Sequence, residues 1–464
     1  MSADTREERL ARRIAGLYST DQQFAAAKPS EAVAAAIEKL GLPLVEIMRT
    51  VMQGYQDRPA LGQRAVEFVT DPHSARSTAK LLPQFETITY GELWNRVGAL
   101  TSALSNVRPG DRVCILGFTS VDYTVIDMAT VPLGAVSVPL QTSAPITQLR
   151  PIVTETQPAV IASSIDYVDA AVELVLTGDA PRTLIVFDYR HEIDEQREAY
   201  DAARARLTEA ASPVFVETLA EALERGRALL AAPEATQDND ALALLIYTSG
   251  STGAPKGAIY TQSMASKLWR PASWGWADSV EPSITLSFMP MSHVMGRSSL
   301  YGTLAHGGTA YFAARSDLST FQEDLALVRP TQLNFVPRVW DMLFQEAQSE
   351  LDRRSSDGAD VASDAEVVTD VRTRLLGNRY ITAITGGAPA SRVLRAWVEL
   401  FLDLHLIDGY GSTEAGGVFL DGQLRRPPVI DYKLVDVPEL GYFHTDRPHP
   451  RGELLLKTTN MFPG

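Results

Sequence analysis

The sequence predicts an α/β fold, in which two doubly wound sheet subdomains form a layered αβαβα core beside a small distorted β-barrel and an N-terminal helical extension. Short apolar runs alternate with helical segments from residue 89 onward, which is the order expected for parallel strands joined by crossover helices. A second series of such runs follows residue 241. After residue 421 the helical pattern ends and short strands with prolines follow, which suits a small barrel.

The first part of the chain, residues 1–60, is expected to be a helical extension. Leu10, Ile14 and Leu17 recur at helical spacing, and the triplet 29–31 opens an alanine-rich segment that stops at Gly41. We expect this extension to be a packing layer rather than a catalytic element.

The first sheet subdomain is expected over roughly residues 85–240. Thr89 and Glu92 form a capping box at the start of a helix. One face of that helix carries Leu93, Val97, Leu100 and Leu104. The strands that follow are predicted at residues 112–116, 134–139, 159–161 and 183–187. Residues 190–240 are charged and alanine-rich, which predicts a surface helix pair and a loop.

The second sheet subdomain is expected over roughly residues 241–420. Its strands are predicted at residues 241–247, 284–288, 309–312, 332–336 and 380–385, with a polar stretch at 353–363. The barrel is expected at roughly residues 421–464, together with part of 61–90.

The composition limits the classes of partner. The formal net charge of -15 argues against a nucleic-acid or anionic-membrane partner, and any phosphate site must be built from local donors. A single cysteine, Cys114, excludes an intrachain disulfide and a Cys-based zinc site, and its strand-like surroundings predict a buried structural thiol. Residues 1–13 have no apolar core of a secretory signal, and no apolar run approaches membrane-spanning length, so we expect a cytoplasmic protein.

The most informative segment is residues 247–257, where an apolar strand breaks into a Gly/Ser/Thr loop that ends in Lys256. Its glycines permit a tight backbone turn that collects N–H groups around one point, and the lysine adds a positive charge. Four hydroxyls add donors: Thr248, Ser249, Ser251 and Thr252. A flexible Gly/Ser linker is the alternative, but the buried strand before the loop and the Pro-Lys-Gly after it argue against one. The P-loop spacing is absent, because Gly257 follows the lysine.

This segment resembles the phosphate loop of the adenylate-forming superfamily, which includes acyl-CoA synthetases, peptide-synthetase adenylation domains, luciferases and carboxylic acid reductases. Residues 289–297, 385–389 and 408–414 match the family pattern in the same order, and residues 451–454 match a late structural marker. Taken alone, the histidine of the first match could be a structural residue, and residues 408–414 could be a helix N-cap with an acidic first turn.

The resemblance implies a site for ATP or AMP with Mg²⁺. The residues that it assigns to the nucleotide are Thr248, Ser249, Gly250, Ser251, Thr252, Gly253, Lys256, His293, Gly386, Gly387, Ala388, Asp408, Gly409, Tyr410, Gly411 and Thr413. Lys256, His293, Thr413 and Glu414 are the expected catalytic set.

The implied roles follow the chemistry of acid activation. Glu414 holds Mg²⁺, Thr413 binds the α-phosphate and Tyr410 stacks on adenine. His293 borders the acyl and AMP pockets, and it need not be a base because a carboxylate substrate is already ionised. The carboxylate attacks the α-phosphorus, pyrophosphate leaves and an acyl-adenylate remains. We expect Lys256 and Glu414 to converge on one triphosphate.

Within the superfamily, much of the chain is similar to bacterial carboxylic acid reductases. The segments that carry this similarity are residues 6–13, 54–60, 82–90, 187–189, 291–297 and 431–442. Such enzymes pass the acyl group to phosphopantetheine on a carrier domain and then reduce it with NADPH to an aldehyde. The family's ribose-binding aspartate, its lid with a catalytic lysine, and its carrier and reductase domains are not found in the sequence. We therefore expect the large core of an adenylation domain, which binds nucleotide but adenylates slowly by itself.

Two alternatives remain open. One is an acyl-CoA ligase, in which free coenzyme A accepts the acyl group. The other is a non-catalytic nucleotide-binding module, against which the presence of Lys256, Thr413 and Glu414 together argues. The expected partners are a small carboxylic acid and the carrier domain of the same parent chain. The expected pocket walls are apolar and small, which suits aromatic or medium-chain aliphatic acids; they are residues 292–300, 334–340, 385–388 and 411–418.

Overall fold

The structure is a computed structural model that describes residues 5–178, 180–236, 238–249, 255–270, 281–356 and 364–464. The chain divides into two compact units, Met1–Gln332 with Thr373–Ile381 and Leu333–Arg372 with Thr382–Gly464. Alternating helices and strands fill both units, which confirms the predicted α/β class. No helix among the described residues is long and apolar enough to cross a membrane.

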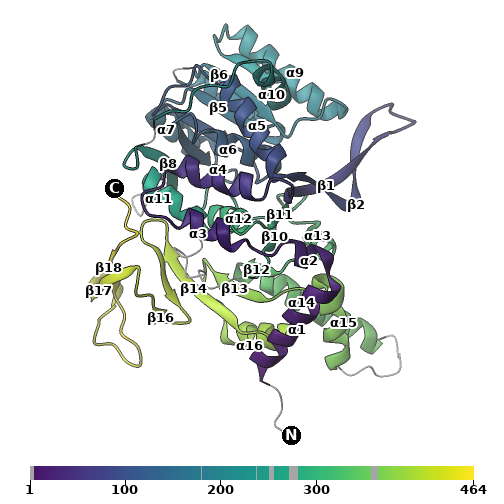
Figure 1. Ribbon diagram of the computed structural model, residues 1–464, viewed down its shortest axis with the longest axis vertical. Helices are drawn as coiled ribbons and strands as arrows, with labels where there is room; N and C mark the ends of the chain where they lie inside the picture. The colour runs from purple at the N-terminus through teal and green to yellow at the C-terminus, as the bar shows by residue number, and fades with distance from the viewer. Residues whose placement is uncertain (1–4, 179, 237, 250–254, 271–280, 357–363) are drawn as a thin grey trace. The chain divides into compact units, whose positions relative to one another are not determined.

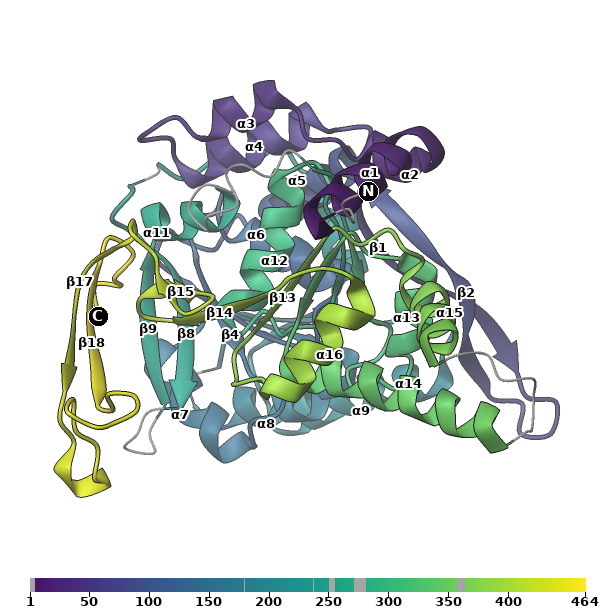
Figure 2. The same cartoon turned by 90° about the horizontal axis from the view of Figure 1, so that it is seen from below.

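The N-terminal segment is helical, as predicted, and belongs to the first unit. It forms α1 (Arg6–Thr20), α2 (Gln22–Ala26), α3 (Glu31–Ile37) and α4 (Leu44–Gly54). Ser30 caps α3, where the sequence predicted a helix start. Helices α3 and α4 pack side by side (Figure 2). Helix α4 buries Leu44, Ile47, Met48 and Val51, so it is the part of the extension that serves as a packing layer.

A seven-stranded sheet dominates the first unit, in the order β7-β6-β5-β3-β4-β8-β9. Its strands are β3 (Arg112–Leu116), β4 (Val136–Leu140), β5 (Val160–Ser164), β6 (Thr183–Phe187), β7 (Phe215–Thr218), β8 (Leu242–Ser249) and β9 (Pro255–Thr261). The strands are parallel except for β9, which runs antiparallel to β8. The doubly wound arrangement was predicted, but its extent differs: β8 was expected to begin the second subdomain and instead pairs with β4 in this sheet.

Helices cover both faces of this sheet. Side chains of α7 (Ile146–Thr156), α8 (Val168–Leu176) and α9 (Asp194–Glu209) share one apolar core with it. Helix α5 (Tyr90–Ala103) packs against α6 (Val121–Ala129) and α10 (Leu219–Arg227) (Figure 1).

Several local predictions are confirmed in this unit. The capping box of Thr89 and Glu92 forms at the start of α5, and all four residues of the predicted helical face are buried. Cys114 is fully buried, and burial raises the pKa of its thiol to about 12, as expected for a structural cysteine. One prediction is wrong: residues 190–240 contain the edge strand β7 between two helices, not a helix pair and a loop alone.

A four-stranded sheet also belongs to the first unit, in the order β10-β11-β1-β2. It contains β1 (Pro59–Thr70), β2 (Ser77–Thr89), β10 (Ile284–Ser287) and β11 (Thr309–Phe312). The hairpin of β1 and β2 projects as a long ribbon (Figure 1). Nearby are α11 (Gln262–Ser266), the 3₁₀ turn η2 (Lys267–Trp269), α12 (Val294–Ala305) and α13 (Phe321–Val328).

The second unit has its own five-stranded sheet, in the order β12-β13-β14-β15-β16. Its strands are β12 (Gln332–Phe335), β13 (Thr382–Gly386), β14 (Leu406–Ser412), β15 (Gly416–Leu420) and β16 (Gln423–Leu424), and its helices include α14 (Pro337–Ser356), α15 (Asp364–Leu376) and α16 (Arg392–Leu402). Beyond them, β17 (Val429–Val435) and β18 (Glu453–Thr458) form an antiparallel ribbon (Figure 2). The short strands after residue 421 were predicted, and the closed barrel stays a prediction.

Candidate functional site

The predicted phosphate loop connects the two strands of a hairpin at the edge of the seven-stranded sheet. In the register of β8 and β9, Tyr247 lies opposite Gly257 and Thr248 lies opposite Lys256. The Lys256 side chain is exposed and Thr248 is half-buried. Ser249 is described through its backbone, and Gly250, Ser251, Thr252 and Gly253 lie outside the described residues.

Tyr247 fixes the base of this hairpin. Its ring is buried in the sheet core, and its hydroxyl donates a hydrogen bond to Glu155 Oε2 at 3.1 Å. A Cβ atom at Gly257 would lie 3.1 Å from the Tyr247 ring, which explains why glycine stands opposite the tyrosine. The hairpin therefore presents Thr248 and Lys256 from a rigid base.

His293 begins helix α12, directly after the turn that follows β10, as predicted. Its Nδ1 accepts a hydrogen bond from the Met295 amide at 3.2 Å, so the histidine itself caps the helix. An accepting Nδ1 carries no proton, which places the proton of the neutral imidazole on Nε2. Surrounding protein atoms lower the pKa of His293 although its side chain is solvent-accessible. At neutral pH this residue offers an Nε2–H donor.

The glycine at the end of β13 lies beside a glycine within β14 in the second unit. Strands β13 and β14 are parallel, with Thr385 opposite Asp408 and Gly386 opposite Gly409. A Cβ atom at Gly386 would lie 2.8 Å from the Gly409 carbonyl oxygen. Gly387 follows with a φ of +78°, in the left-handed region that favours glycine, and it and Ala388 are exposed. The result is an accessible backbone surface with few side chains, against which a flat ring can lie.

Tyr410 continues β14 next to this surface. Its side chain is 54% exposed, and its ring centroid lies 6.0 Å from that of Phe419 on β15. Asp408 accepts a hydrogen bond from Arg395 of α16, with Nη1 and Oδ2 3.0 Å apart. The prediction did not include Arg395, because no local pattern links a helical arginine to an aspartate within a strand 13 residues later.

Thr413 and Glu414 form the turn between β14 and β15. The alternative in which residues 408–414 cap a helix is therefore wrong, because the chain makes a β-hairpin there. Gly411 permits the close approach of the two strands, since a Cβ atom on it would lie 2.5 Å from the Gly416 carbonyl oxygen. Thr413 is buried and Glu414 is half-buried. The backbone carbonyl of Glu414 accepts a hydrogen bond from Phe462, whereas no described residue binds its carboxylate.

The predicted site residues thus fall into two groups. The first unit holds the β8–β9 hairpin and His293, and the second unit holds residues 386–388 and 408–414. The convergence of Lys256 and Glu414 on one triphosphate stays a prediction.

Comparison with known proteins identifies the class. A sequence model of the family described as AMP-binding enzyme matches residues 53–464. The chain therefore belongs to the AMP-binding enzymes.

Closer relatives identify the branch. A carboxylic acid reductase of Mycobacterium tuberculosis is 63% identical over 99% of this chain and 39% of its own length. The adenylation domain of the Segniliparus rugosus carboxylic acid reductase, in complex with AMP and a co-purified carboxylic acid, superposes with a TM-score of 0.92 at 49% identity over 98% of this chain and 73% of that one. The A-PCP didomain from the same organism, in complex with AMP, superposes with a TM-score of 0.93 at 51% identity over 98% of this chain and 64% of that one.

These relatives show that the chain belongs with the adenylation domains of carboxylic acid reductases. It spans about two-fifths of the length of the curated reductases that it matches.

Proposed function

We propose that this chain binds ATP and a carboxylic acid and joins them as an acyl-adenylate. The observation that carries the proposal is the register of β13 and β14, which places Gly386 beside Gly409 and next to the exposed ring of Tyr410. This arrangement has the two features that a purine needs, a flat backbone surface and an aromatic ring to stack on. The 49% identical Segniliparus rugosus domain was solved with AMP and a carboxylic acid, which supports the same pair of ligands here.

The remaining site residues divide the work between the phosphates and the acid. We assign the β8–β9 hairpin to the polyphosphate, because Lys256 is an exposed cation beside a run of hydroxyls and glycines. Thr413 is assigned to the α-phosphate. His293 donates its Nε2 proton to an oxygen of the substrate, since its Nδ1 already accepts the Met295 amide. A residue that donates in this way orients the carboxylate without removing a proton from it.

Glu414 suits the Mg²⁺ ion that ATP brings. Its carboxylate is half-buried and has no partner among the described residues. Those residues hold no cluster of three or more His, Cys, Asp or Glu that could bind a metal. Magnesium commonly takes one or two protein carboxylates, with phosphate oxygens and water completing its shell. When bound, the ion would neutralise charge on the phosphates, and Glu414 would hold it.

In the longer protein, we propose that the acyl group passes to phosphopantetheine on a carrier domain and that NADPH reduces it to an aldehyde. Two kinds of relative support this extension: the curated carboxylic acid reductases, and the A-PCP didomain that matches this chain.

Calorimetric titration tests the proposal with two probes. AMP should bind, and octanoyl sulfamoyl adenosine, a stable analogue of an acyl-adenylate, should bind at least about tenfold tighter because it fills both subsites. A folded sample that does not bind AMP contradicts the nucleotide site. An analogue that binds no tighter than AMP contradicts the adjoining acid site.

A further inference from the structure

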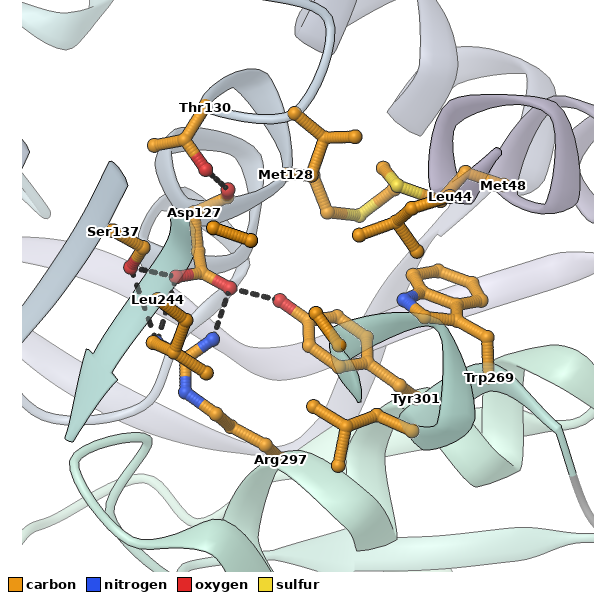
Figure 3. Close-up of a pocket in the computed structure, with 14 residues that line it drawn as sticks. Leu44, Met48, Asp127, Met128, Thr130, Ser137, Leu244, Trp269, Arg297 and Tyr301 are labelled. Carbon is orange, nitrogen blue, oxygen red and sulfur yellow. Dashed lines mark hydrogen bonds and ion pairs between the residues drawn. The ribbon is translucent and has the colours of Figure 1, made fainter. Parts of the chain in front are cut away.

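A buried ion pair in the first unit lies one helical turn beyond His293. Asp127 of α6 and Arg297 of α12 are each less than 5% exposed. Arg297 donates from Nη1 to Asp127 Oδ2 at 2.7 Å and from Nη2 to Asp127 Oδ1 at 2.8 Å (Figure 3). This bidentate arrangement uses the planar shape of the guanidinium group.

We propose that the Asp127–Arg297 pair is a positioning element that holds His293 in its substrate-facing place, an inference that rests on the proposed function of His293.

The third donor of Arg297 connects the pair to the segment that carries His293. Arg297 Nε donates to the Met291 carbonyl oxygen at 2.8 Å, two residues before the histidine. The His293 amide donates to the Pro290 carbonyl at 3.0 Å, and the Arg297 amide donates back to the His293 carbonyl at 3.4 Å. Two of these three hydrogen bonds end on Arg297, one at the Met291 carbonyl and one at the His293 carbonyl, so the arginine holds the chain on both sides of the imidazole.

Gly296 tightens the same turn. A Cβ atom there would lie 2.4 Å from the Pro290 carbonyl oxygen, so the chain before His293 rests directly on the first turn of α12. A shift of Arg297 would move the carbonyl of Met291 and, with it, the backbone that sets the direction of the imidazole.

The pair is itself fixed from the sheet. Ser137 of β4 donates to Asp127 Oδ1 at 2.5 Å, and Tyr301 of α12 donates to Asp127 Oδ2 (Figure 3). Burial raises the pKa of Asp127, but the charge and hydrogen bonds of Arg297 outweigh it and leave the pKa below its usual value. Both groups are therefore charged at neutral pH, and the aspartate transmits the position of β4 and α6 to the start of α12.

Apolar side chains shield this network. A cavity of about 30 Å³ beside it is lined on the other side by Leu44, Met48 and Trp269 (Figure 3). Because both side chains of the pair are almost fully buried, their electrostatic contact is stronger than it would be at the surface, which favours a single geometry for Arg297.

A second buried arginine provides a matched control. Arg64 donates from Nη1 to the buried Asp324 at 2.6 Å and from Nε to the Leu82 carbonyl at 2.7 Å, so it repeats the pattern of a buried carboxylate plus a backbone carbonyl. No hydrogen bond of Arg64 among the described residues reaches residues 289–297. Loss of Arg64 should therefore affect stability but not His293.

The experiment compares Arg297→Lys with Arg64→Lys in the full chain. Lysine keeps the positive charge but cannot reproduce a guanidinium that binds two acceptors at fixed angles. Long-range ¹H–¹⁵N spectra resolve the imidazole signals, because the chain has only 7 histidines. The signal that is missing from the spectrum of His293→Gln is that of His293. Thermal unfolding and binding of octanoyl sulfamoyl adenosine are measured on the same samples.

In the wild type, the His293 signal should show an unprotonated Nδ1 and a protonated Nε2 at pH 7. Arg297→Lys should shift this signal and weaken binding of the analogue about tenfold. Arg64→Lys should lower thermal stability while both readouts stay as in the wild type.

Two results would overturn the inference. One is an Arg297→Lys protein with an unchanged His293 signal and unchanged affinity, which would make the pair purely stabilising. The other is an equal shift of the signal in Arg64→Lys. If Arg297→Lys does not fold, the His293 signal and the affinity for the analogue are measured on the isosteric variant Asp127→Asn, with the same expected and overturning results. A wild type that fails to bind the analogue contradicts the proposed function instead, and the His293 signal still reports on positioning.

Discussion

Replacement of Tyr410 by alanine isolates the adenine contribution. The side chain is 54% exposed, and its described aromatic neighbour is Phe419, with ring centroids 6.0 Å apart and planes tilted by 55°. Truncation therefore removes little packing and should lower the free energy of unfolding of the free protein by on the order of 1 kcal/mol or less. Stacking of a base on an aromatic ring contributes about 1–3 kcal/mol by alanine substitution. The Kd for AMP should accordingly rise by about 5- to 150-fold, since each 1.4 kcal/mol is about tenfold.

Calorimetric titration with AMP measures this change, and thermal unfolding measures the stability of the same samples. Tyr410→Phe keeps the ring and should bind AMP within about threefold of the wild type, because a hydroxyl adds little to stacking. Tyr432→Ala is the matched control, since Tyr432 is 52% exposed on β17 of the same unit. A folded Tyr410→Ala protein that binds AMP within twofold of the wild type would refute the assignment of this ring to adenine.

Three further predictions concern the phosphates and the buried acids. Lys256→Met should weaken the binding of ATP about tenfold and the binding of AMP much less, because AMP lacks the distal phosphates. An equal loss of affinity for both nucleotides in titrations would contradict this role. Glu414→Gln should weaken the binding of ATP in the presence of Mg²⁺. Removing the metal with EDTA should cause the same loss of affinity in the wild type and no further loss in the variant. Burial and the charge of Asp122 raise the pKa of Asp188 well above its usual value. The native state then binds the proton more tightly than the unfolded state. The contribution of Asp188 to the free energy of unfolding is therefore fully present below about pH 4 and is lost as the pH rises through the pKa of the folded state. Asp188→Asn should raise the melting temperature more at pH 8 than at pH 5, and a pH-independent difference would argue against this titration.

The sequence predicts those parts of the fold that depend on local chemistry. The capping box at Thr89 and Glu92 needs two residues three positions apart, and the structure forms it. Strands β3, β6 and β11 have the predicted bounds, because each is a short apolar run between polar segments. Strand β7 was missed, since it has four residues at the sheet edge and its Phe215 is 56% exposed. An edge strand buries too little to leave a clear apolar pattern.

The site is predictable in its segments but not in its pairings. The glycine-rich loop was singled out by its composition, and residues 408–414 by their resemblance to the family pattern. The pairing of β13 with β14 and the hairpin turn at Thr413 depend on hydrogen bonds between separate strands, which no local pattern specifies. Arg297 and Asp127 are 170 residues apart in the chain, and their pairing has no spacing signal. The one available hint was an arginine among small and apolar residues one turn after His293.

The expectation that Lys256 and Glu414 serve one triphosphate can be tested without reference to how the two units are arranged. Residues that contact the same ligand lose affinity non-additively, because removing one contact lets the ligand reposition at the other. Independent residues give changes in binding free energy that add within about 0.3–0.5 kcal/mol. In titrations with ATP and Mg²⁺, the double variant Lys256→Met/Glu414→Gln should deviate from additivity by more than this, and the deviation should vanish with AMP. Strict additivity with ATP would place the lysine and the carboxylate on different ligands and would remove the basis for assigning them to one reaction.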